Sequence, residues 1–229
     1  MSGDYMDGDH VLRRPMRTPK TNTPSAPAAA PRYHHGNLVE ALVAATIEII
    51  EERGVEQVSV REAARRAGVS PGAPFRHFAT KTALMTAVAE QAMDRLKASV
   101  DVAIEATREQ KPLLRLEALG SAYLQWALQN PTHFQIISSR SLIDIASSDR
   151  IRQANEEIRG VMMRLLAEAQ LDGSLAPDID IGHLVLVTRA FGYGLARMVI
   201  DGHFPEWHAS EPPEDVVPKA LRLFMGLLR

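Results

Sequence analysis

Apolar residues recur at helical spacing from about residue 38 onward. Leu38, Leu42, Ala45 and Ile49 are separated by three or four residues, which places them on one face of a helix. Gly54 follows, and glycine readily takes the left-handed backbone conformation that ends a helix. The pattern predicts a first helix that stops near Gly54.

A second, short helix is predicted between Ser59 and Gly68. Ser59 stands three residues before Glu62, which is the spacing of a capping box, and Gly68 suits the sharp turn at the other end. Ala63 and Ala64 are small enough for a neighbouring helix to pack closely. The spacing therefore indicates a compact pair of helices around this turn.

A third, very short helix is expected to follow. Ser70 is a good N-cap, and Pro71 takes the first helical position, where its missing N–H costs nothing. We expect this helix to run to about Phe78, with Phe75 and Phe78 in the small core. Two short helices joined by a turn that contains glycine are typical of a helix-turn-helix, whose second helix presents its N-terminal end to the major groove of DNA.

Longer helices fill the rest of the chain. Thr80 is placed to cap a fourth helix that begins with Lys81 and extends past Val100. Prolines and glycines divide the remaining sequence into five stretches with helical periodicity. These stretches lie at about 112–129, 132–140, 148–170, 180–201 and 214–228. No stretch alternates convincingly as a strand does, so the pattern predicts an all-α protein.

Composition adds an N-terminal extension and excludes some chemistry. Residues 1–31 are rich in proline, threonine, alanine and aspartate, so we expect them to be disordered; their basic residues either contact DNA phosphates or belong to a passive tail. The chain has no cysteine, which excludes disulfides, thiol nucleophiles and cysteine-based zinc sites. We find no signal-peptide pattern and no apolar run long enough to span a membrane, so a cytoplasmic protein is expected.

Charge is distributed unevenly along the chain. The formal net charge is -2, but five basic residues and one acidic residue lie between positions 57 and 81. A basic region on an otherwise acidic protein is typical of a DNA-binding module, and it is equally compatible with a solvated face.

The sequence around this basic region resembles the TetR/AcrR family of transcriptional regulators. The resemblance covers Tyr-His-His-Gly-Asn-Leu at 33–38, Arg-Glu-Ala-Ala-Arg at 61–65, the run at 67–78, and Lys81 with Leu84. It implies an N-terminal three-helix helix-turn-helix domain and a long fourth helix that joins it to a helical domain for dimerisation and ligand binding. The domains expected on this basis are 1–31 (disordered extension), 32–82 (DNA-binding) and 83–229 (effector-binding and dimerisation).

The resemblance also implies which residues contact DNA. Arg76 would face the major groove, and His77 and Lys81 would hold the phosphate backbone. The full set of implied DNA-binding residues is Arg61, Ser70, Gly72, Ala73, Arg76, His77 and Lys81. The family usually has a tyrosine at position 75, whose hydroxyl bonds a phosphate, and Phe75 cannot form that bond.

The opening motif is similar to that of a subgroup whose C-terminal domain carries a Trp…His-Gly-Leu-Ala signature. The matching stretch here reads Arg189-Ala-Phe-Gly-Tyr-Gly-Leu-Ala, which keeps Gly-Leu-Ala. Arg189 and Tyr193 stand where the signature has tryptophan and histidine, so no pocket role is carried over from it.

The C-terminal helices are expected to form the dimer and the effector pocket. In the family the last two long helices pack against their twins as a four-helix bundle. The apolar residues available for this bundle, or for the subunit's own core, are Leu184, Leu186, Phe191, Leu195, Leu221, Phe224, Met225 and Leu228. Aromatic and methionine side chains suit an apolar effector, and each is also a candidate for the core. The candidates for the pocket wall are Tyr123, Trp126, Phe134, Met162, Met163, Phe191 and Tyr193.

These features predict a homodimeric repressor that binds near-palindromic operator DNA and is released by a small, largely apolar effector. The alternative is a DNA-binding protein without an effector, acting constitutively. We do not expect an enzyme, because the sequence has no Gly-x-Ser-x-Gly, His-Glu-x-x-His or phosphate-loop motif. We expect no cofactor and no metal, since the adjacent His34 and His35 have no third ligand near them in sequence.

Overall fold

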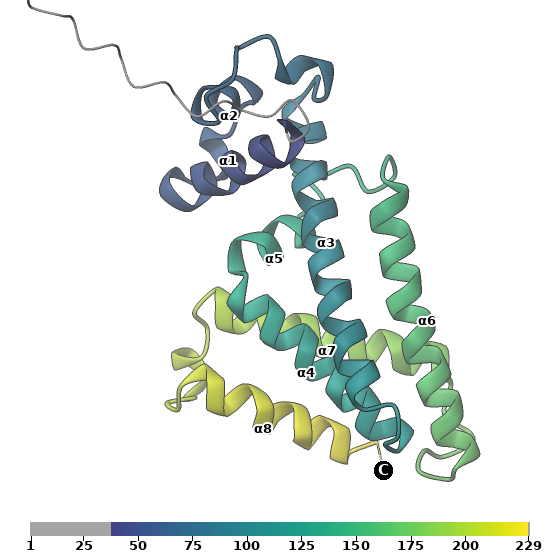
Figure 1. The fold of residues 1–229 in the computed structure, drawn as a ribbon. Coiled ribbons are helices and arrows are strands. Elements are labelled where there is room, and N and C mark those ends of the chain that lie inside the picture. The colour runs from purple at the N-terminus through teal and green to yellow at the C-terminus, as the bar shows by residue number, and fades with distance from the viewer. Residues whose placement is uncertain (1–37, 229) are drawn as a thin grey trace, which may run out of the picture. The chain divides into compact units, whose positions relative to one another are not determined.

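The computed structural model describes residues 38–228, and their regular elements are helical (Figure 1). The α-helices are α1 (Leu38–Arg53), α2 (Val60–Arg66), α3 (Lys81–Ala106), α4 (Pro112–Gln129), α5 (Pro131–Ser138), α6 (Asp149–Leu171), α7 (Ile181–Ile200) and α8 (Pro213–Gly226). Short 3-10 turns are η1 (Val55–Gln57), η2 (Pro74–Arg76) and η3 (Pro205–Trp207). This confirms the all-α prediction. The predicted extension and the opening motif up to position 37, with His34 and His35, lie outside the described residues.

The helix ends follow the capping pattern in the sequence. Gly54 and Gly68 both have positive φ, 85° and 68°, at the ends of α1 and α2. The Ser59 hydroxyl accepts a hydrogen bond from the Glu62 N–H at 3.1 Å, and the Thr80 hydroxyl accepts one from the Ala83 N–H at 3.0 Å. These local bonds fix where α2 and α3 begin.

The third helix of the predicted helix-turn-helix is shorter than expected. A helix was expected from Ser70 to Phe78. The chain instead forms irregular turns there, with one short 3-10 segment, η2, among them. Pro74 has no N–H to donate to the Ser70 carbonyl, so the Ala73 N–H takes that acceptor at 3.1 Å. The N–H groups of His77 and Phe78 then both bond the Pro74 carbonyl at 2.8 Å. The proline therefore limits the helix to one tight turn.

Helix α3 connects the two groups of helices (Figure 1). Its N-terminal part packs with α1, and its remainder packs against α4, α5 and α6. Leu84 is fully buried near its start, as are Leu42 and Ile49 of α1. Helix α4 in turn packs against α6, α7 and α8. The domain boundary predicted between residues 82 and 83 falls in the first turn of α3, and it stays a prediction.

The connection between α5 and α6 is bonded to the side of α3. The Thr86 hydroxyl accepts a hydrogen bond from the Asp144 N–H at 3.0 Å. The Ser148 hydroxyl donates to Glu90 Oε1 at 2.6 Å and accepts from the Ile151 N–H at 3.2 Å, so it also caps α6. The N-terminus of α6 is thereby held directly on α3.

Candidate functional site

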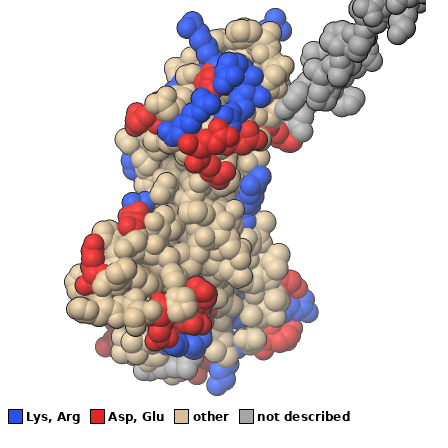
Figure 2. Space-filling model, turned by 90° about the vertical axis from the view of Figure 1, so that its left-hand side faces the viewer, with Lys and Arg blue, Asp and Glu red and all other residues tan. Residues whose placement is uncertain are grey.

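The DNA-binding residues implied by the resemblance lie between the start of α2 and the start of α3. Most of them are exposed, whereas Ala73 and Lys81 are half-buried. Figure 2 shows Lys and Arg side chains gathered at the end of the molecule that holds α1 and α2, above a band of Asp and Glu. The exposed members are Arg61, Ser70, Gly72, Arg76 and His77.

Two of the five basic residues in this region are paired with carboxylates. Arg65 Nη2 lies 2.6 Å from Glu62 Oε1, and Arg66 Nη1 donates to Glu52 Oε1 at 2.6 Å. The hydrogen bond from Arg66 lowers the pKa of Glu52, and the bond from Arg65 lowers the pKa of Glu62. Arg61 and Arg76 form no ion pair within the described chain. Their guanidinium groups are therefore available to an external anion.

Lys81 has a structural bond that the sequence did not reveal. Its ammonium group donates to the Val55 carbonyl at 2.7 Å and so ties the start of α3 to η1. An ammonium group has three donors, so this bond leaves two for another acceptor.

Phe75 is 45% exposed, and the prediction that it lies in the core is wrong. Pro74 is buried in its place, and Phe78 is 6% exposed. The physical reason is the tight turn: the Phe78 N–H bonds the Pro74 carbonyl, so these two residues share the inward side and Phe75 is turned outward.

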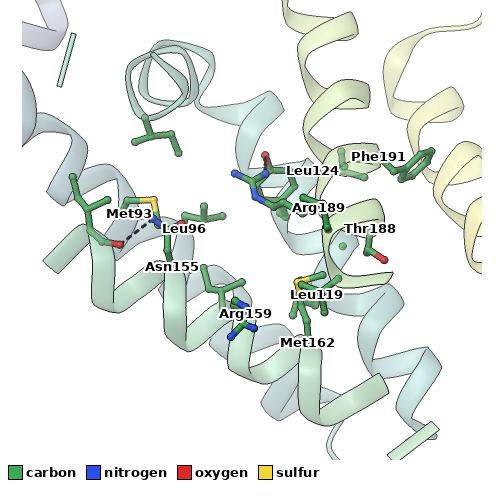
Figure 3. A pocket seen from close by; sticks show the side chains of 18 of the residues that line it. Met93, Leu96, Leu119, Leu124, Asn155, Arg159, Met162, Thr188, Arg189 and Phe191 are labelled. Carbon is green, nitrogen blue, oxygen red and sulfur yellow. Dashed lines mark hydrogen bonds between the residues drawn. The ribbon is translucent and has the colours of Figure 1, made fainter. Parts of the chain in front are cut away.

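A cavity of about 360 Å³ lies among α3, α4, α6 and α7 (Figure 3). Its volume falls in the range of small-molecule sites. Most of the wall is apolar, from residues such as Leu96, Leu119 and Met162. The polar and charged side chains of the lining are Tyr123, Arg140, Asn155, Arg159, Thr188 and Arg189.

Some of the predicted wall residues line this cavity and others do not. Tyr123, Met162 and Phe191 belong to the lining. Trp126 and Phe134 are buried in the core outside it. The others outside the lining are Met163, which packs against the core, and Tyr193, which is 37% exposed with its ring centroid 5.9 Å from that of Phe134.

Arg189 is a lining residue that sequence reasoning did not propose. Its Nη1 donates to the Tyr123 hydroxyl at 2.6 Å, and its guanidinium carbon lies 5.0 Å from the centroid of the Tyr123 ring. The same carbon lies 5.8 Å from the Tyr193 ring. The two signature positions, Arg189 and Tyr193, are thus in contact with each other. The sequence showed that Arg189 departs from the signature, but it did not show that Arg189 lines a cavity.

Helices α7 and α8 leave large apolar side chains exposed. Among the bundle candidates Leu186 is 65% exposed, whereas Leu184, Leu221 and Met225 are buried. Phe191 stacks on Phe224 with centroids 4.3 Å apart, and Leu195 and Leu228 are also half-buried. Exposed positions that sequence reasoning missed are Val187, Leu223 and Leu227.

Helix α7 also meets a criterion that the sequence reading did not anticipate. By length and composition alone it is apolar enough to cross a membrane, and 22% of this apolar stretch is buried. One helix of this kind is weak evidence for a membrane span.

Comparisons with known proteins agree with the fold. The model of bacterial regulatory proteins of the tetR family matches residues 42–88, and the model of the tetracyclin repressor-like C-terminal domain matches residues 116–224. A solved protein of unknown function from Rhodococcus sp. RHA1 is 30% identical, with a TM-score of 0.72 over 87% of this chain and 99% of that one. The ketosteroid transcriptional regulator KstR2 of Mycobacterium tuberculosis shares the fold, with a TM-score of 0.61 at 21% identity over 82% of this chain and 93% of that one.

Curated relatives have regulatory or DNA-related names. The HTH-type transcriptional repressor KstR2 of Mycolicibacterium smegmatis is 27% identical over 70% of this chain and 74% of its own length. The fatty acid metabolism regulator protein of Bacillus subtilis is 24% identical over 77% of this chain and 86% of its own. The nucleoid occlusion factor SlmA of Sodalis glossinidius is 26% identical over 73% and 85%.

A helical body with an N-terminal helix-turn-helix and an internal cavity defines a class of transcriptional regulators. This chain belongs to the TetR family of that class. The curated relatives described above are named as regulators or as a nucleoid occlusion factor. The cytoplasmic location stays a prediction.

Proposed function

We propose that this protein is a homodimeric repressor that binds a near-palindromic operator and is released by a small, largely apolar effector. The observation that carries the DNA-binding part is the pair of exposed guanidinium groups at Arg61 and Arg76. Arg61 lies near the start of α2 and Arg76 at the end of η2, and no carboxylate of the described chain forms an ion pair with either. Relatives named as a transcriptional repressor and a metabolism regulator support the regulatory role.

The exposed apolar side chains of α7 and α8 support the dimer. Leu186, Leu223 and Leu227 are each more than 60% exposed in the single chain. Large apolar side chains exposed on two helices that pack against each other indicate an interface. A two-fold dimer would set two recognition elements about 34–36 Å apart, one turn of DNA or a multiple of it.

The cavity supports regulation by a ligand. Release from DNA requires an effector that binds one dimer conformation more tightly than the DNA-bound one. Coupling of this kind is typically about 1–3 kcal/mol, or roughly 5–150-fold in operator affinity. The SlmA relative is named for nucleoid occlusion, so the constitutive DNA-binding protein stays the second candidate.

The test is selection of bound sequences from random DNA, with sedimentation of the resulting complex. We expect a near-palindromic site bound by a dimer. The variant Arg76→Ala should weaken binding by about 1–3 kcal/mol and relax preference at one position of each half-site if Arg76 contacts a base. The matched control is Arg164→Ala, an exposed arginine on α6 far along the chain from the helix-turn-helix. A short asymmetric site bound by a monomer would refute the dimer.

The effector is tested by filling the cavity. The variant Met162→Trp should blunt the response to ligand more than it changes operator affinity, because Met162 lines the cavity and is remote from α2 in sequence. Loss of DNA binding with an unchanged ligand response would show that Met162 serves only the core.

A further inference from the structure

Every charged residue in the lining of the described cavity is an arginine. Arg140, Arg159 and Arg189 line it, and no aspartate or glutamate does. All three residues are exposed, so they lie on the side of the lining that solvent reaches, here called the mouth of the cavity. The rest of the wall is formed mainly by buried apolar side chains, among them Leu96 and Leu119. The cavity is therefore apolar inside and positively charged at its mouth.

These arginines differ in how far the protein already neutralises them. Arg159 Nη1 pairs with Glu156 Oε1 at 2.8 Å. Arg140 and Arg189 form no ion pair with a carboxylate within residues 38–228. The cavity thus carries positive charge that the described chain does not compensate.

Arg189 is held in a fixed orientation. The stack against the Tyr123 and Tyr193 rings and the 2.6 Å bond to the Tyr123 hydroxyl restrain its guanidinium group. A guanidinium group has five N–H donors in a planar fork, so the bond to Tyr123 leaves donors for a bidentate partner. A restrained donor loses little further freedom when an anion binds.

The Tyr123 hydroxyl adds a second donor at the same place. It accepts from Arg189, and its own O–H remains free to donate. Burial raises the pKa of Tyr123, although the nearby guanidinium group of Arg189 opposes this effect. The phenol therefore keeps its proton at neutral pH.

We propose that the cavity takes an amphipathic carboxylic acid, whose carboxylate binds Arg189 and the Tyr123 hydroxyl while its apolar body lies against the inner wall. The inference rests on the proposed effector function and refines it, because it adds one anionic group to a largely apolar ligand. A carboxylate at the mouth keeps part of its hydration, so its transfer costs less than full burial would. The apolar body gains the free energy of leaving water.

The test compares acids with neutral analogues of the same shape. Decanoate and decanol form one pair of probes, and 2-naphthoate and 2-naphthol form another. Calorimetric titration at neutral pH gives the ratio of affinities within each pair for the full-length protein. We expect at least one acid to bind about tenfold more tightly than its alcohol, as one charge-assisted hydrogen bond near solvent allows.

Variants assign that preference to Arg189. In Arg189→Met, which keeps an apolar stem on the tyrosine rings, the ratio should fall to about one because the acid loses far more affinity than the alcohol. Arg189→Lys should retain part of the preference. The control Arg164→Met removes an arginine of α6 that is outside the cavity lining and should leave the ratio unchanged.

Three results would overturn the inference: a ratio near one in the wild type, an equal loss of acid and alcohol binding in Arg189→Met, or no binding of either acid at millimolar concentration. Operator release, followed in parallel, separates this inference from the proposed function. If acid and alcohol release DNA equally well, effector regulation stands and the acid preference fails. If the acid binds selectively without releasing DNA, the ligand class stands and the regulatory role fails.

Discussion

Replacing Phe75 with tyrosine should tighten operator binding. The Phe75 ring is 45% exposed beside the implied DNA contacts, and the family's usual tyrosine offers its hydroxyl to a phosphate there. An exposed ring gains a hydroxyl without burying a polar group, so the stability of the fold should not change. One net hydrogen bond is worth about 0.5–1.5 kcal/mol. A dimer forms it twice, so Phe75→Tyr should raise affinity by about 1–3 kcal/mol, or roughly 5–150-fold.

Fluorescence anisotropy with the selected operator at constant salt measures this gain, and urea unfolding measures stability. The contrast is Phe78→Tyr, which adds the same hydroxyl to a ring that is only 6% exposed. That variant should unfold more easily and gain no affinity, because its hydroxyl enters the core. The salt dependence of Phe75→Tyr should match the wild type, since a neutral hydroxyl displaces no counterion. Unchanged or weaker binding by Phe75→Tyr would refute the placement of residue 75 beside the DNA backbone.

Three further predictions follow from single residues. Lys81→Met should reduce the slope of log affinity against log salt by about one unit, and an unchanged slope in salt titrations would contradict the phosphate contact. The same variant loses the bond to the Val55 carbonyl, so its unfolding free energy should fall by about 1–2 kcal/mol in urea unfolding. Gly68→Ala should cost about 1 kcal/mol by urea unfolding, because φ is positive there although space is free, whereas Gly72→Ala, with free space and no positive φ, should cost nothing. Burial lowers the pKa of His133, so as pH falls through about 6.5 the unfolded state binds a proton before the folded state does. The stability of the fold should therefore decrease on acidification. In urea unfolding, His133→Leu should flatten that part of the pH profile.

Local features of the fold were predictable from the sequence because each depends on a few neighbouring residues. The caps at Ser59 and Thr80 are examples, since a hydroxyl and an N–H three residues later decide them. The burial of Phe75 was predicted wrongly because one tight turn at Pro74 reverses which side chain faces inward. Two residues of the same apolar kind can both fit the helical pattern and still differ in whether they line a cavity.

Which residues line the cavity was only partly predictable, because lining the cavity depends on how several helices pack together. Trp126 and Met162 are both buried on helices, but only Met162 lines the cavity, because that depends on how four helices are rotated against one another. Arg189 was recognisable as a departure from a signature. Its contact with Tyr123 joins residues 66 positions apart and needed the fold.

Because α3 is long, a small tilt of the helix beside the cavity becomes a larger displacement at its N-terminus. Met93 lines the cavity and Lys81 begins the same helix, about 18 Å away along the axis. A straight rod of that length turns a tilt of about 6° at Met93 into a displacement of about 2 Å at Lys81. In a two-fold dimer the displacements of the two subunits add, which alters the separation of the recognition elements by about 4 Å against a DNA repeat of about 34 Å. Because Ser148 bonds Glu90 on α3, a ligand that moves the start of α6 would act on α3 close to Met93, whereas the proposed DNA contacts lie farther away, at the N-terminal end of the helix.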